Sequence, residues 1–218
     1  SRCGGSDWTP AFGAAPRYTD PGFTVGVIGN LVHSKQVDMA IRSLAGLDNG
    51  PPMARLLVVG DGPERAALEV LARRLGLGSR ALFTGALPPE EIPGVLARCH
   101  VLVLASRSEG RPNVVLEAMA AGVTVVAGDI AGVREMIVHG ERGLLFPVGD
   151  ERRLAADLRS LMDDPALGRR LAANARQWLD DQGLTWENTA RRYADIYRQV
   201  IRRQVIRRQV IRQRRDRN

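Results

Sequence analysis

The sequence predicts a single α/β domain built on a doubly wound parallel sheet. Two observations predict this fold. Short apolar runs rich in β-branched residues alternate with longer stretches of helical period. The apolar runs are nearly continuous, which is typical of strands buried on both faces of a parallel sheet. Regular strand–helix alternation then indicates one open sheet with right-handed crossovers.

The elements follow from this pattern in chain order. The expected strands are 23–29, 55–60, 81–84, 101–105, 123–127 and 143–148. The expected helices are 36–47, 64–75, 89–98, 113–121, 132–138, 151–163, 166–180 and 186–212. Residues 1–22 are rich in Gly, Pro and Ser, so we assign them to a linker or N-terminal extension. Residues 23–185 form the predicted Rossmann-like domain, and 186–218 a C-terminal helix.

The composition is that of a globular protein. Apolar residues make up 44% and charged residues 25% of the 218 residues. No apolar run reaches the roughly 20 residues that span a bilayer, and the first residues lack the apolar core of a secretory signal. Two cysteines, Cys3 and Cys99, do not make a disulfide framework. We therefore expect a cytoplasmic protein, in a reducing compartment.

The basic charge belongs to the C-terminal tail. The chain carries +7 overall, but residues 191–218 hold eleven Arg against two Asp, which leaves −2 for residues 1–190. The tail repeats Gln-Val-Ile-Arg-Arg, and a five-residue repeat does not match the helical turn, so its apolar pairs precess around the helix. Three alternatives stay open for the tail: a solvated helical extension, weak contact with anionic membrane that would make the protein peripheral, or a partner. The repeat has no aromatic stacking residues, and we expect no nucleic acid.

The segment 106–122, Ser-Arg-Ser-Glu-Gly-Arg-Pro-Asn-Val-Val-Leu-Glu-Ala-Met-Ala-Ala-Gly, has the strongest chemical pattern. It follows an apolar strand and opens a helix, and ligands of open α/β sheets bind at the carboxyl ends of strands. Pro112 suits the first turn of a helix, and Gly110 allows close approach of the backbone to a ligand. The free N–H groups of such a helix start form a natural diphosphate site. Glu109 and Glu117 could accept hydrogen bonds from sugar hydroxyls there.

This segment closely resembles the signature of the group-1 (family 4) retaining GT-B glycosyltransferases. The resemblance rests on two Glu with seven residues between them, Glu109 and Glu117, the second followed by Ala-Met-Ala-x-Gly. It continues through residues 23 to about 197, in the family's order. The further matching segments are Val58-Val59-Gly60-Asp61-Gly62-Pro63, Phe83-Thr84-Gly85, Ala127 to Glu135 and Gly143 to Asp150. By this resemblance the chain is the C-terminal, donor-binding domain of such an enzyme.

The resemblance also implies roles for individual residues. Glu117 would hold the ribose hydroxyls, and Glu109 the hydroxyls of the transferred sugar. The backbone from Gly110 to Val114 would meet the sugar and diphosphate. Lys35 and Glu109 are the implied catalytic residues. The implied donor-binding residues are Asn30, Gly60, Gly85, Gly110, Arg111, Pro112, Asn113, Val114 and Glu117.

One position departs from the family pattern. The family neutralises the leaving diphosphate with an Arg and a Lys five positions apart after the first strand. Lys35 occupies the Lys position, but Asn30 stands at the Arg position. The departure removes one charge that would stabilise the leaving group.

Simpler interpretations stand beside these roles. The two Glu could be ordinary helix-entry carboxylates, and Lys35 a solvated residue at a helix start. Gly60-Asp61-Gly62 is a strand-end turn and not a dinucleotide fingerprint, because Arg65 stands at the third glycine position. The three His are scattered and no Asp-x-Asp occurs, so we expect no metal and no cofactor besides a nucleoside-diphosphate sugar as substrate.

Family members have an N-terminal Rossmann domain that binds the acceptor, and this domain is absent from the 218 residues. Two functions therefore remain open. The chain is the donor-binding domain of a retaining hexosyltransferase, inactive in transfer by itself; or it is a nucleotide-sugar-binding module without independent catalysis, needing a separate acceptor domain or partner. A sugar-nucleotide epimerase of the same fold has poorer support from the motif.

Overall fold

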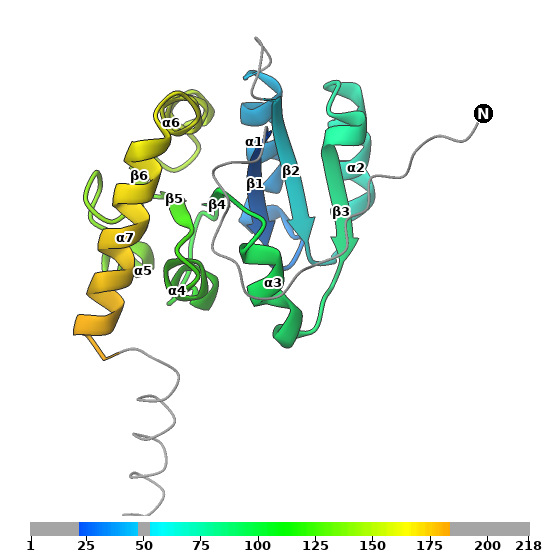
Figure 1. Ribbon diagram of the computed structural model, residues 1–218. Coiled ribbons are helices and arrows are strands. Elements are labelled where there is room, and N and C mark those ends of the chain that lie inside the picture. Colours follow the sequence, from blue (N-terminus) through cyan, green and yellow to red (C-terminus); the bar gives the residue numbers. More distant parts are fainter. Residues whose placement is uncertain (1–21, 48–52, 184–218) are drawn as a thin grey trace, which may run out of the picture. The chain divides into compact units, whose positions relative to one another are not determined.

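The computed structural model describes residues 22–47 and 53–183 (Figure 1). The chain divides into two compact units, Ser1–Gln177 and Trp178–Asn218, and the fold below is that of the first. Residues 1–21 of the predicted extension 1–22 and the predicted helix 186–212 with its basic repeat lie outside the described residues, whereas Gly22 begins the first strand.

The first unit contains a six-stranded sheet, parallel throughout, in the order β3-β2-β1-β4-β5-β6. Its strands are β1 (Gly22–Ile28), β2 (Met53–Val59), β3 (Ala81–Gly85), β4 (Val101–Leu104), β5 (Thr124–Gly128) and β6 (Leu144–Phe146). The arrowheads of β2 and β3 point to the lower end of the view in Figure 1. The predicted doubly wound Rossmann-like fold is confirmed.

Helices connect successive strands. They are α1 (Val37–Ala45), α2 (Arg65–Arg74), α3 (Ile92–Leu96), α4 (Asn113–Ala120), α5 (Ala131–Arg134), α6 (Glu151–Asp163) and α7 (Pro165–Asp181), with short 3-10 turns η1 (His33–Lys35), η2 (Gly78–Arg80) and η3 (Pro89–Glu91). The chain steps from β1 towards β3 in one direction and from β4 towards β6 in the other. Right-handed crossovers therefore put α1 and α2 on one face and α4 and α5 on the opposite face. After β6, α6 returns to pack against α1.

The central strands form the core because their side chains are apolar on both faces. β4 and β5 are buried along their whole length, and β1 is buried except for Ile28 at its end. Leu154, Leu158 and Leu161 recur at helical spacing on α6 and are all buried. No helix in the described ranges is both long and apolar enough to cross a membrane.

Two predicted helices were too long. The stretch 89–98 is a 3-10 turn followed by α3, which ends at Leu96. The stretch 132–138 is helical only in α5, up to Arg134. The apolar residues Met136 and Ile137 extend the helical pattern in the sequence, but in the structure both are buried outside the helix. The chain then forms an isolated β-bridge between His139 and Gly143.

Candidate functional site

The strand order reverses between β1 and β4, and the candidate site lies at the carboxyl ends of these two strands. A pocket there has two sides. One side is lined by Val27, Ile28, Gly29, Asn30, Lys35 and Val37, and the other by Val103, Leu104, Ala105 and Ser106. Ligands of open α/β sheets bind at such a reversal, because the crossovers leave it in opposite directions and open a crevice.

Two loops form the rim of this crevice. The first loop, residues 29–36, follows β1, and the second loop, residues 105–112, follows β4. An ion pair joins them, from Lys35 Nζ to Glu109 Oε1, with the two side chains only 29% and 15% exposed. The backbone N–H of Arg107 also donates to the carbonyl oxygen of Ser34, over 3.0 Å. The structure thus brings together the two residues predicted as catalytic, 74 positions apart.

Glycines hold the first loop against the loop that follows β2. A Cβ atom on Gly60 would lie 1.9 Å from the carbonyl oxygen of Gly29, and one on Gly62 would lie 2.4 Å from that of Leu31. The N–H of Gly60 donates to Gly85 over 2.8 Å. Only glycine fits where backbones approach so closely. The structure therefore places Gly60 behind the first loop, beside Gly85.

The second loop leads into α4. Pro112 is the N-cap residue of α4 in an extended conformation, one position before the first turn where we predicted it. No side chain among the described residues caps this helix start. The N–H groups of Asn113 and Val114 are therefore left free at the positive end of the helix dipole. Gly110, Arg111 and Asn113 are exposed. An uncapped helix start is suited to an anion, and the loop that leads into this one is ion-paired to Lys35.

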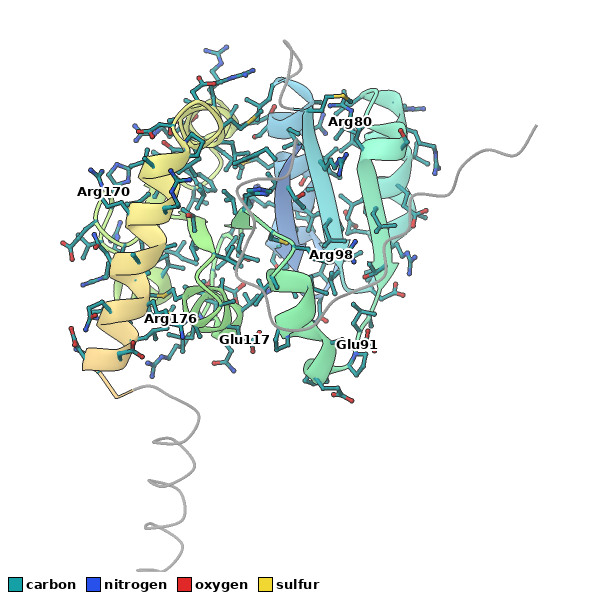
Figure 2. The ribbon with its side chains drawn as sticks, in the orientation of Figure 1. Arg80, Glu91, Arg98, Glu117, Arg170 and Arg176 are labelled. Atoms are coloured by element: carbon teal, nitrogen blue, oxygen red, sulfur yellow. The ribbon has the colours of Figure 1, made fainter. Side chains whose placement is uncertain are left out.

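Glu117 lies on α4, one turn inside the helix (Figure 2). It is partly buried, and this burial raises the pKa of its carboxyl group. Among the described residues no side chain donates a hydrogen bond to this carboxylate, and Glu117 is not among the residues that line the pocket. The structure thus joins Asn30, Lys35 and Glu109 around the crevice and leaves Glu117 further along α4.

Three residues of the site were not predicted from the sequence. Ser106 lines the pocket and is fully buried, and its hydroxyl group has no hydrogen-bond partner within the described part of the chain. Gln36 ends the first loop in a left-handed conformation. Gly132, at the start of α5, contacts the backbone of the second loop. Ser106 belongs to the motif and could have been found from it, but the other two depend on contacts between distant segments.

Metal ligands do not gather in the residues that the structure describes, where no group of three or more His, Cys, Asp and Glu could hold an ion.

The family of the chain follows from comparison with known proteins. Residues 16–178 match the family described as "Glycosyl transferases group 1". The chain therefore belongs to the group 1 glycosyltransferases, and its fold is one half of the GT-B architecture.

Particular relatives agree with this assignment. The chain is 35% identical over 145 residues to the 2-deoxystreptamine glucosyltransferase of Streptomyces kanamyceticus, covering 66% of this chain and 38% of that protein. It is similar to the Anabaena protein HepE in complex with UDP-glucose, with a TM-score of 0.68 and 30% identity over 73% of this chain and 44% of that chain. It is also similar to the C-terminal domain of a group 1 glycosyltransferase (LpcC) from Francisella tularensis, with a TM-score of 0.68 and 26% identity over 75% of this chain and 87% of that chain. The chain thus spans less than half the length of the first two proteins, but most of the third.

Proposed function

We propose that this chain is the donor-binding domain of a retaining glycosyltransferase that transfers a hexose-type sugar from a nucleoside-diphosphate sugar. The observation that carries the proposal is the pairing of Lys35 with Glu109 across the crevice, beside the uncapped start of α4. Lys35 lines the crevice, Glu109 pairs with it from the second loop, and that loop leads into the free N–H groups of α4. A sugar diphosphate needs a cation, N–H donors and a carboxylate. The UDP-glucose bound by HepE and the separate C-terminal domain of LpcC support this assignment.

Each group has a role in this proposal. The ammonium of Lys35 and the N–H groups at the start of α4 bind the diphosphate. The carboxylate of Glu117 accepts hydrogen bonds from the ribose hydroxyls, and that of Glu109 from hydroxyls of the sugar. In the free chain Glu109 neutralises Lys35. A diphosphate that takes Lys35 as its counter-ion frees Glu109 to accept a hydrogen bond from the sugar.

Positioning and charge account for the chemistry. The acceptor hydroxyl oxygen forms a bond to the anomeric carbon on the face from which the diphosphate oxygen leaves. Its proton passes to an oxygen of the departing phosphate, so configuration is retained and no protein nucleophile is needed. Lys35 and the backbone dipoles stabilise the charge that grows on the leaving group. Asn30, exposed at the same crevice, supplies no charge, which lowers this stabilisation.

Transfer needs a second domain. The crevice of this chain binds a donor on one side only, and an acceptor must be oriented and water excluded by a surface facing it. We therefore propose that an N-terminal Rossmann domain supplies this surface and that this chain alone binds the donor without transferring it. The second candidate is a sugar-nucleotide-binding module without catalysis, which the neutral Asn30 favours.

Calorimetric titration with UDP, GDP, ADP and their sugar conjugates tests the donor site. We expect one of the three bases to give micromolar binding, unchanged by a metal chelator. Lys35→Ala should lower the affinity for the nucleoside diphosphate by about ten- to a hundredfold and leave the affinity for the free nucleoside unchanged. The matched control is Arg42→Ala, an exposed cation on α1 that pairs with Asp38 outside the crevice. If no nucleoside diphosphate binds, or if Lys35→Ala binds as tightly as the control and wild type, the donor-site assignment is wrong.

A transfer assay separates the two candidates. The isolated chain is incubated with labelled donor and a panel of acceptors, and then again with the N-terminal domain of a group 1 relative added. We expect at most slow donor hydrolysis from the isolated chain. Multiple-turnover transfer without a partner would contradict the half-site proposal. Replacing Asn30 with Arg in an assembled enzyme should raise the transfer rate if the chain is catalytic, and have no effect if it is a binding module.

A further inference from the structure

We propose that Gln36 is a positioning residue, which bridges the two loops of the crevice and holds Lys35 in place for the donor diphosphate. The proposal rests on the donor site described above and adds a residue whose side chain does not itself line the pocket. Gln36 directly follows Lys35 and precedes α1.

The backbone of Gln36 is unusual. Its φ and ψ are 47° and 44°, and it is the only residue other than glycine with positive φ in the described ranges. A side chain makes this conformation unfavourable, so glycine is the residue that a left-handed junction favours. Gln36 is the N-cap residue of α1, yet its side chain makes no capping hydrogen bond. The side chain of Gln36 is therefore available for contacts other than capping α1.

The carboxamide of Gln36 reaches the second loop. With its amide nitrogen directed to the carbonyl oxygen of Ala105, the two atoms are 3.1 Å apart, and its oxygen then accepts a hydrogen bond from Arg107 Nε over 3.2 Å. Its two neighbours also contact the second loop, Ser34 through its carbonyl oxygen and Lys35 through Glu109. Three consecutive residues of the first loop thus bind the second loop.

These three links respond differently to a donor. When the diphosphate takes Lys35 as its counter-ion, the ion pair with Glu109 is weakened, and one cross-loop link is lost at the moment of binding. The Ser34–Arg107 backbone hydrogen bond and the Gln36 bridge remain. Gln36 therefore keeps the two loops in register while the neighbouring lysine exchanges one partner for another. A lysine on an unbridged loop would lose rotational and translational freedom on binding, which lowers affinity.

The sequence supplies a direct readout of this effect. Lys35 is the only lysine among the 218 residues, so the α-amino group of the chain is the only other amine. An amine-directed acylating reagent therefore reports on Lys35 by mass spectrometry, with the α-amino group as internal reference. Because this measurement needs no donor, it tests the bridge separately from the proposed function.

The experiment compares wild type with Gln36→Gly, Arg107→Ala and the double variant. Gln36→Gly removes the bridge and suits the left-handed backbone, so its melting temperature should stay within a few degrees of wild type. Affinity for the nucleoside diphosphate should fall roughly three- to tenfold. Acylation of Lys35 in the donor-free protein should become severalfold faster. Arg107→Ala removes one arm of the bridge from the other loop and should raise the acylation rate in the same direction.

Two comparisons make the result decisive. The double variant should be no worse than Gln36→Gly, because both changes break the same bridge. Ser108→Ala, an exposed position of the second loop, is the control and should match wild type in all measurements. If Gln36→Gly and Arg107→Ala bind diphosphate and are acylated at wild-type rates, the bridge has no positioning role. If wild type binds no nucleoside diphosphate, the donor site fails, and the acylation rates still decide whether Gln36 restrains Lys35.

Discussion

Gly132 packs directly against Gly110: a Cβ atom on Gly132 would lie 2.0 Å from the carbonyl oxygen of Gly110 and 2.6 Å from that of Glu109. The start of α5 therefore packs against the backbone of the second loop and restrains the segment that carries Glu109. Gly110 differs, since a Cβ atom there would meet no atom within 4 Å. The two glycines can thus be separated by experiment, one by its effect on the fold and the other by its effect on the ligand.

Gly110→Ala should leave the fold unchanged and impair donor binding. The position has open space in the free protein and no left-handed φ, so the apo chain tolerates a methyl group. The same methyl group would occupy the space through which a sugar diphosphate approaches the loop. We expect an unchanged melting temperature and a loss of about tenfold or more in diphosphate affinity. Unchanged affinity would show that the ligand does not approach this part of the loop.

Gly132→Ala should destabilise the protein. The added methyl group meets backbone atoms that cannot rotate away, so the second loop must shift. The expected loss is about 1–3 kcal/mol in the free energy of unfolding, measured with urea. Gly78→Ala is the matched control, because a Cβ atom there has no neighbour within 4 Å. Equal stability of the two variants would contradict the close packing of α5 on the loop.

Glu117→Gln should stabilise the free chain and weaken donor binding. Burial raises the pKa of Glu117, so the folded state keeps this proton to higher pH than the unfolded state. The free energy of unfolding therefore falls as the pH rises from the ordinary carboxyl pKa through the raised one. Gln does not titrate, so this part of the pH dependence should disappear, and the melting temperature at neutral pH should rise slightly.

In the proposed donor site the same variant loses the charge of the carboxylate that accepts hydrogen bonds from the ribose hydroxyls. Two charge-assisted hydrogen bonds become neutral, and affinity for the nucleoside diphosphate should fall about ten- to a hundredfold. Calorimetric titration and thermal melting on the same preparation measure both effects. A variant that binds like wild type would remove Glu117 from the donor site, whatever its stability.

Cys99 should resist thiol reagents while the chain is folded. It is fully buried, and burial raises its pKa from 9.0 to about 12. The thiolate is the reactive form, and below pH 8 its fraction falls about a thousandfold with a shift of this size. In a Cys3→Ser variant, the modification rate of Cys99 should follow global unfolding in urea. Rapid modification without denaturant would show that the helix before β4 opens in the native state.

The strands could be predicted closely because their signal is local. Each strand is a short β-branched run between turn residues, and predicted and observed strands overlap throughout. The predicted helices 89–98 and 132–138 extended too far. In the second, Met136 and Ile137 are buried although they lie outside the helix. An apolar pattern indicates burial, and periodicity alone does not show whether a buried residue is helical.

The site could be predicted only as far as its residues lie in one contiguous motif. Glu109, Gly110 and Glu117 stand in such a string, and Lys35 was identified from the family's pattern. The left-handed conformation of Gln36 could not be foreseen, because this conformation favours glycine and nothing in the local sequence marks a glutamine for it. The packing of Gly132 against the second loop depends on a contact between segments more than twenty residues apart. Such contacts follow from the packing of α5 against a loop and leave no local pattern.

The strand order has a consequence for how this molecule could be divided. β1 and β4 share only two registered residue pairs, Val25 with Val101 and Gly26 with Leu102, whereas β1 and β2 share seven. A cut between Gly85 and Pro89 would give two fragments, each with three adjacent strands. Their seam would consist of this short ladder and the packing of α6 on α1. The crevice lies across the seam, so a donor bound there would promote reassembly of the fragments by mass action. If the proposed donor site holds, a chain cut at this point would report nucleotide-sugar binding through the association of its two fragments.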